Sequence, residues 1–141
     1  MDEVRARRVR LRGAMDALEA ALAAPVPGRV PDWWVAVLNC LRDLRVALGD
    51  HITEAEAEGG LLAQILADAP RLANAVNQLC REHIELADAV DALLVRPAPT
   101  NGDTAAIRDA GLELLGRLAR HRHKGADLLY EAYSVDVSGG D

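Results

Sequence analysis

The residues of this chain that could perform chemistry are a small set of imidazoles and carboxylates. Of the four histidines, His51, His83 and His121 each interrupt the apolar stripe of a predicted helix. Imidazole is a common ligand of transition metals, and it also serves as a general acid or base near neutral pH. The pattern therefore indicates metal binding or proton transfer inside the protein.

Two carboxylates follow the first of these histidines at helical spacing. Glu54 and Glu58 come three and seven residues after His51, so both project near the His51 face of a helix. A buried carboxylate needs a metal, an arginine or a shared proton, so inward acids would complete a metal site. The alternative is a solvated helix end next to Gly59.

A second set of candidates lies near the carboxyl end of the chain. His123, Asp127 and Glu131 follow one another at four-residue intervals, which is also the spacing of surface ion pairs on a helix. The apolar stripe that includes His121 and the one that includes His123 are different faces of one helix. The sequence leaves open which of these two faces points into the protein.

Proline and glycine divide the chain into the elements that must position these side chains. The breakers predict helices at residues 2–24, 32–58, 70–95 and 103–133, one or two further turns at 61–67, and a flexible tail at 134–141. Short connections favour antiparallel neighbours. The fold class expected is therefore all-α, an up-down-up-down antiparallel four-helix bundle that forms a single domain over residues 1–141.

The first predicted helix differs from the other three because its apolar stripe contains no histidine. Arg8 is the polar residue on that stripe. If Arg8 points inward, it could pair with Glu54 or Glu58 and replace a metal charge, whereas a long arginine can also reach solvent without any such role. Whether His51, His83 and His121 meet depends on the relative shift of the helices.

Composition agrees with a helical protein and excludes several classes. The 141 residues are 50% hydrophobic but only 3% aromatic, with no Phe, which disfavours disorder and a β-sandwich. A net charge of −6 argues against a nucleic-acid partner. With no apolar leader and no membrane-length apolar run, we expect a cytoplasmic protein without a membrane partner, and Cys40 and Cys80 as free thiols.

Three segments together resemble the hemerythrin-like (HHE) domain family. They are residues 50–54 (DHITE), 81–86 (REHIEL) and 120–123 (RHRH), which are similar to the second, third and fourth helix motifs of the family. Family members are four-helix bundles that hold a non-haem di-iron centre with five histidines and two bridging carboxylates. This chain departs from the family pattern in its first helix, which lacks a histidine, and at Ala55, where the family usually has an acid.

The resemblance implies a metal-binding protein with non-haem iron, mononuclear or dinuclear. It would bind dioxygen or a small oxidant, or would sense iron or redox state. The ligands that it implies are His51, Glu54, Glu58, His83 and His121, with His123, Asp127 and Glu131 as further candidates and Arg8 as a replacement for a ligand.

Two other functions compete with this one. A bundle that lost its metal could be a binding or scaffold module, acting through protein or small-molecule contacts or as a homodimer. An enzyme could also use the histidines and acids for general acid–base chemistry, although no nucleophile–base pair is visible in the sequence. Whether the chain is an enzyme is therefore left open.

Overall fold

The computed structural model describes the backbone of residues 2–139, and side chains between residues 3 and 134 except that of residue 4. The described residues form helices joined by short loops, without a strand. The elements are α1 (Asp2–Ala23), α2 (Val30–Glu56), α3 (Leu61–Asp68), the 3-10 turn η1 (Pro70–Leu72), α4 (Ala73–Leu94) and α5 (Thr104–Gly139).

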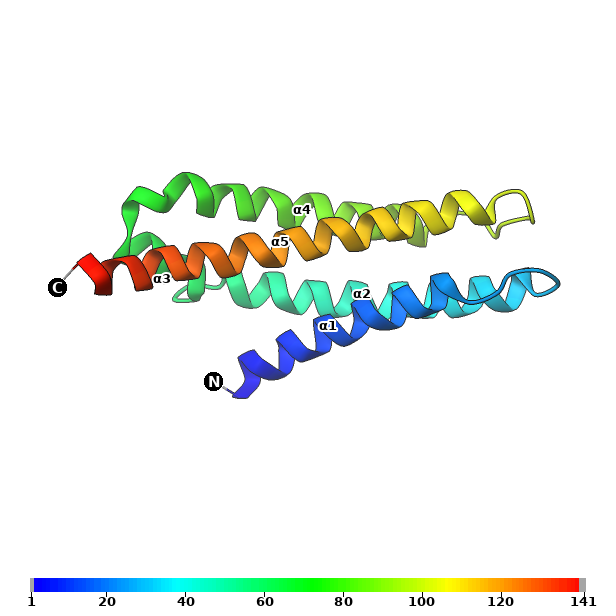
Figure 1. Ribbon diagram of the computed structural model, residues 1–141, viewed down its shortest axis with the longest axis horizontal. Helices are drawn as coiled ribbons and strands as arrows, with labels where there is room; N and C mark the ends of the chain where they lie inside the picture. Colours follow the sequence, from blue (N-terminus) through cyan, green and yellow to red (C-terminus); the bar gives the residue numbers. More distant parts are fainter. Residues whose placement is uncertain (1, 140–141) are drawn as a thin grey trace.

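The four long helices pack together, an arrangement that fits a four-helix bundle (Figure 1). Helix α1 packs chiefly against α2, whereas α4 packs against both α5 and α2. The α1–α2 and α4–α5 loops lie at one end of the molecule, whereas both chain termini and α3 lie towards the other (Figure 1). Among the described helices, none combines the length and the hydropathy that crossing a membrane requires.

The helix bounds differ from the predicted ones mainly at two ends. Helix α2 ends at Glu56 rather than at residue 58, because Gly59, with φ +73°, and Gly60 turn the chain towards α3. Helix α5 continues past its predicted end at Tyr133 to Gly139, since residues 134–138 contain no proline or glycine. The predicted tail is thus helical through residue 139, and residues 140 and 141 lie outside the described part. The turns predicted at 61–67 are present as α3.

The apolar core consists of two clusters. The larger cluster joins α1, α2, α4 and α5, and the smaller one joins α3, η1, α4 and α5. Along α4, His83 separates Leu79 of the smaller cluster from Leu86 of the larger. His121 likewise stands between the two clusters along α5, so the histidines occupy a polar layer between two apolar regions.

Close packing of α1 on α5 depends on a glycine and an arginine. A Cβ added at Gly111 would lie 2.6 Å from Leu22 Cδ1, so glycine permits this approach. Nearby, Arg108 donates hydrogen bonds from Nε to the Leu22 carbonyl (2.6 Å) and from Nη2 to the Ala24 carbonyl (3.0 Å). Arg108 thereby satisfies carbonyl groups at the end of α1, which lack partners within the helix.

Candidate metal centre

Three imidazoles from three helices converge at one depth of the bundle. His51 lies on α2, His83 on α4 and His121 on α5, and their ligand atoms are all within 4.8 Å of one another. The ring centroids are 5.4 Å apart for His51–His83, 5.9 Å for His51–His121 and 4.8 Å for His83–His121. The prediction that these three residues interrupt inward-facing stripes is confirmed, since His83 and His121 are buried and His51 is half-buried.

The position of the rings follows from the apolar stripe of each helix. On α4 the stripe reads Leu79, His83, Leu86 and Val90, all buried. Side chains three and four residues apart share a helix face, so packing the leucines also turns the histidine inwards. The same spacing buries His121 with its stripe on α5, which settles the choice between the two predicted faces.

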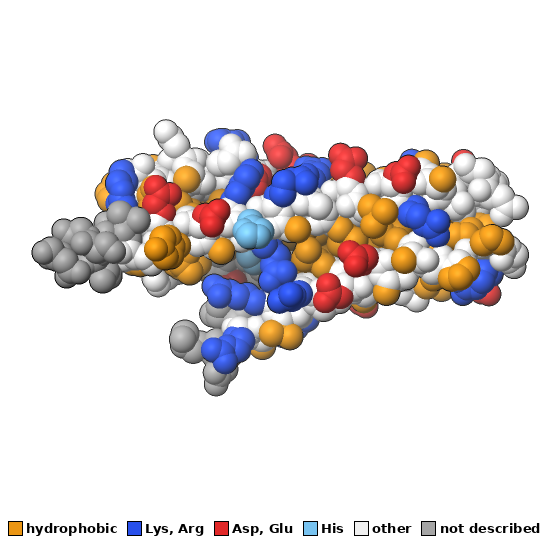
Figure 2. All heavy atoms as spheres, viewed as in Figure 1, with side chains coloured by type: hydrophobic (Ala, Val, Ile, Leu, Met, Phe, Trp, Pro, Cys, Tyr) orange, Lys and Arg blue, Asp and Glu red, His pale blue; other side chains and the backbone are white. Residues whose placement is uncertain are grey.

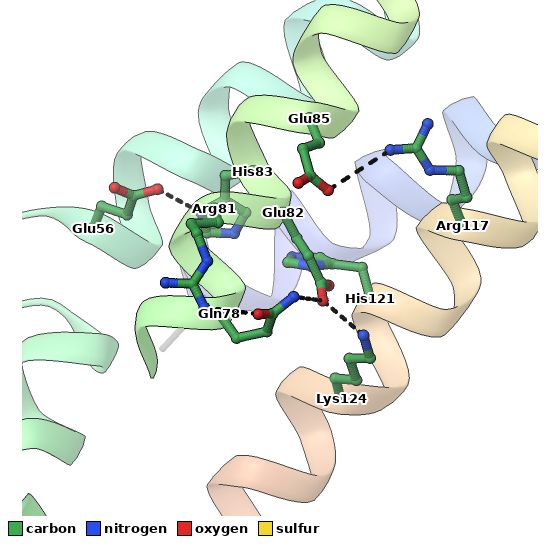
Figure 3. Close-up of polar contacts among 9 residues, drawn as sticks. All are labelled: Glu56, Gln78, Arg81, Glu82, His83, Glu85, Arg117, His121 and Lys124. Atoms are coloured by element: carbon green, nitrogen blue, oxygen red, sulfur yellow. Dashed lines mark hydrogen bonds and ion pairs between the residues drawn. The ribbon is translucent and has the colours of Figure 1, made fainter. Parts of the chain in front are cut away.

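Two of the imidazoles are held by carboxylates. His83 Nδ1 lies 2.5 Å from Glu56 Oε2, and His121 Nδ1 lies 2.9 Å from Glu82 Oε1 (Figure 3). A carboxylate at Nδ1 favours the proton on that nitrogen and leaves Nε2 with its lone pair. Metal-binding histidines usually have such a partner on their second nitrogen, because it fixes the ring and makes it a better ligand.

Glu82 is the most heavily bonded carboxylate of the site. It accepts hydrogen bonds from Lys124 Nζ at 2.6 Å and Gln78 Nε2 at 3.2 Å in addition to His121 (Figure 3). Burial raises the pKa of Glu82, but the hydrogen bonds from Lys124, His121 and Gln78 outweigh it and bring the pKa to about 2. Glu82 therefore stays a carboxylate beside His121 at neutral pH.

The surroundings of His51 and His121 favour the neutral form of both rings. Burial and the proximity of His83 and His121 lower the pKa of His51 to about 4. Burial also lowers the pKa of His121, although Glu82 opposes this shift. Neutral imidazoles are the form that binds metals.

The predicted acidic ligands lie outside this cluster. Glu54 turns towards α1 and receives a 2.6 Å hydrogen bond from Arg7 Nη1. Glu58 is exposed in the turn after α2, because the helix has already ended at Glu56. Arg8 is exposed at the edge of the site, and the arginine that pairs with Glu54 is its neighbour Arg7.

The second predicted set also stays apart from the imidazole cluster. His123, Asp127 and Glu131 are exposed on α5, because burial of the Leu118–His121–Leu128 stripe turns their side of the helix outwards. His123 contributes to the rim of the adjacent cavity, but the structure does not bring its ring to the other three.

Sequence reasoning missed the two carboxylates that contact the rings. Glu56 lies off the His51 stripe, and its partner is on a different helix, so spacing within α2 could not reveal the contact. Glu82 carried a weak signal: it directly precedes His83 and follows Gln78 by four residues, a spacing at which side chains meet on a helix.

The three rings form part of the wall of a cavity of about 530 Å³. Basic side chains border the histidine visible on the face shown in Figure 2. The remaining wall is mostly apolar, with Leu62 and Ile65 from α3 and Leu79 from α4 among the lining residues. A small molecule could therefore reach the imidazoles from this cavity.

The donor set fits one transition-metal ion. Imidazole nitrogens suit zinc, copper, iron and nickel, whereas magnesium and calcium prefer oxygen. Metal–nitrogen bonds of about 2.0–2.1 Å require ligand atoms roughly 3.3 Å apart, so ligand atoms that are now up to 4.8 Å apart would move together by about 1.5 Å at most. The chain has four histidines in total, fewer than the five of a hemerythrin di-iron centre, and its cluster among the described residues contains imidazoles alone.

Comparison with known proteins supplies no relative: no family model, no curated protein and no solved structure matches this chain.

Proposed function

We propose that this protein is a hemerythrin-like bundle that binds a single transition-metal ion through His51, His83 and His121. The observation that supports this most strongly is the pair of imidazole–carboxylate contacts, His83 with Glu56 and His121 with Glu82. The carboxylates that satisfy these buried rings would also hold them as ligands, and both rings line a cavity. The resemblance to the hemerythrin-like family implies iron as the metal.

The proposal includes the antiparallel up-down-up-down topology of that family. Support comes from the short α1–α2 and α4–α5 loops, which lie at the same end of the molecule (Figure 1). The connection between α2 and α4, which contains α3 and η1, would then lie at the opposite end.

Three protein ligands leave part of the coordination sphere of the ion to a small molecule. Such an ion supplies a Lewis-acidic or redox-active centre, and dioxygen or a small oxidant is the partner that we propose. The protein residues hold the rings: Glu56 and Glu82 retain protons on Nδ1, and Lys124 keeps Glu82 in place. The leucines around the cavity would limit access of water.

Metal analysis tests the proposal directly. Protein produced with added iron should contain about one ion per chain, and His83→Ala should lose it. His123→Ala is the matched control, since His123 lies on the exposed side of α5 and should leave the metal content unchanged. If neither iron nor another first-row transition metal is retained, or if His83→Ala retains it fully, the proposal is wrong.

A second candidate function, a metal-free module that binds a small molecule, is favoured by the cavity. It predicts that a chelator leaves the thermal stability unchanged and that His51→Ala and His83→Ala are tolerated.

A further inference from the structure

The cavity beside the histidines has the size of a small-molecule site. Its volume of about 530 Å³ lies within the range of roughly 300–1,000 Å³ common for such sites. Residues of α1, α2, α3, α4 and α5 all contribute to its wall. It therefore lies where all these helices meet, rather than along one exposed helix face.

Charge is distributed unevenly around this cavity. The chain has 22 acidic and 16 basic residues apart from its histidines, yet no acid is among the described residues that line the cavity. The lining includes instead all four histidines and three arginines, Arg8, Arg12 and Arg122. The histidines add no charge while they are neutral, so the three arginines create a local positive potential that attracts an anion.

The cavity arginines differ from their neighbours on α1. Arg7 and Arg10, which lie outside the cavity, form ion pairs with Glu54 at 2.6 Å and Asp50 at 3.4 Å. Within the described part of the chain, Arg8, Arg12 and Arg122 form no ion pair. Their guanidinium groups thus remain available to a ligand.

Part of the wall is aliphatic. Leu61, Leu62 and Ile65 of α3 line the cavity together with Leu128 and Leu129 of α5. Contact with these side chains would remove a hydrocarbon chain from water, which is favourable in proportion to the apolar area buried.

We propose that the cavity binds an aliphatic carboxylate, with its chain among these leucines and its carboxylate at Arg8 and Arg122. Guanidinium groups bind carboxylates through paired, charge-assisted hydrogen bonds. The inference goes beyond metal binding and does not require the ion, because the arginines supply the positive charge. It specifies the small molecule of the second candidate function.

Calorimetric titration of chelator-treated protein with octanoate tests the ligand class. Octanoate should bind at least tenfold more tightly than acetate, which lacks the chain, and than 1-octanol, which lacks the charge. Extension to decanoate should tighten binding by up to about fourfold per added methylene. Absence of octanoate binding, or equal binding of octanoate and 1-octanol, would overturn the inference.

Matched variants test the assigned residues. Arg8→Ala and Arg122→Ala should each weaken octanoate binding roughly tenfold, as expected for loss of a hydrogen bond between charged groups. Arg10→Ala, on the same helix as Arg8 but outside the cavity, should not. A binding constant that is insensitive to Arg8→Ala and Arg122→Ala contradicts the assignment.

A second variant pair tests the cavity itself without altering charge. Gly125 lines the cavity, and a Cβ added there meets no atom within 4 Å. Gly125→Leu should therefore fill part of the space and weaken octanoate binding at least tenfold, whereas Gly13→Leu, equally unobstructed but outside the cavity, should have no effect. Equal binding by both variants would place the ligand elsewhere.

The same titration with metal-loaded protein separates this inference from the proposed metal site. The inference is supported if octanoate still binds after chelation and if its affinity depends on Arg8 and Arg122. This holds even if the protein never retains a metal. Octanoate binding that occurs only with the ion present would show that the metal, and not the arginines, holds the anion.

Discussion

Each histidine of the cluster has a different set of neighbours. His83 and His121 have a carboxylate at Nδ1, from Glu56 and Glu82 respectively. The His51 ring lies 5.4 Å from that of His83 and 5.9 Å from that of His121, and the charge of either one would oppose its protonation. Burial lowers the pKa of His51 and of His121, so protonation of these two rings opposes the folded state.

We expect the metal-free protein to lose stability as the pH falls from about 6.5 towards 4. The pKa of His51 is about 4 in the folded protein, against 6.5 for an unperturbed histidine, so the unfolded chain binds the proton first. This single group should reduce the free energy of unfolding by about 2 kcal/mol between pH 7.5 and pH 5. Urea denaturation at both pH values measures it.

His51→Leu is the control for this pH dependence, because leucine continues the apolar stripe and does not titrate. The variant should show a smaller loss of stability over the same pH interval. An identical pH dependence in both proteins would assign the effect to other groups.

A second prediction concerns Glu82. Glu82→Gln should lower the free energy of unfolding by about 1–3 kcal/mol at pH 7, because Lys124 and His121 lose a charged acceptor. Its metal affinity should fall roughly 10- to 100-fold, as for other carboxylates that hold a metal-binding histidine. Equilibrium dialysis and urea denaturation give the two values.

Glu85→Gln is a matched control on the same helix, since Glu85 is exposed and lies 4.0 Å from Arg117. It should change the free energy of unfolding and the metal affinity little.

The stability that Glu82 contributes as an anion should be present above pH 4.5 and disappear as the pH falls through about 2, because the pKa of Glu82 is depressed.

Two of the glycines of helix α5 differ in the space around them. Gly111 is pressed against Leu22 of α1, whereas Gly125 faces the cavity. Alanine favours a helix over glycine by about 0.5–1 kcal/mol when nothing obstructs its methyl group. The effect of the same substitution should therefore have opposite signs at the two positions.

We expect Gly125→Ala to raise the free energy of unfolding by about 0.5–1 kcal/mol. Gly111→Ala should lower it by about 1 kcal/mol, because displacement of the buried Leu22 side chain costs about 1–3 kcal/mol and exceeds the helix gain. Thermal unfolding of both variants measures the difference. Stabilisation by Gly111→Ala would show that α1 and α5 separate readily.

At the scale of elements, periodicity within a helix predicted much more than contacts between helices. The stripes through His51, His83 and His121 follow from spacing along one chain segment, and the structure buries them as predicted. Glu56 and Glu82 contact rings on other helices, so their role depends on the relative shift and rotation of α2, α4 and α5. The end of α2, two residues before its predicted position, likewise removes Glu58 from the site.

The whole molecule has two apolar clusters with a polar layer between them. A ligand that binds this layer in the folded state alone should stabilise the entire chain. An ion present at about 100 times its dissociation constant would add about 2.7 kcal/mol to the free energy of unfolding. The midpoint of thermal unfolding should therefore rise with added iron in the wild type but not in His83→Ala; an equal rise in both would indicate binding elsewhere.

The three rings come from segments far apart in the chain, with His51 in the α1–α2 pair and His121 in the α4–α5 pair. Contacts between such distant residues require closure of a long loop, so they tend to form late during folding. Interactions that are absent from the transition state slow unfolding without accelerating folding. Occupation of this layer should thus prolong the lifetime of the native state, while the rate at which the chain first collapses into a bundle stays nearly the same.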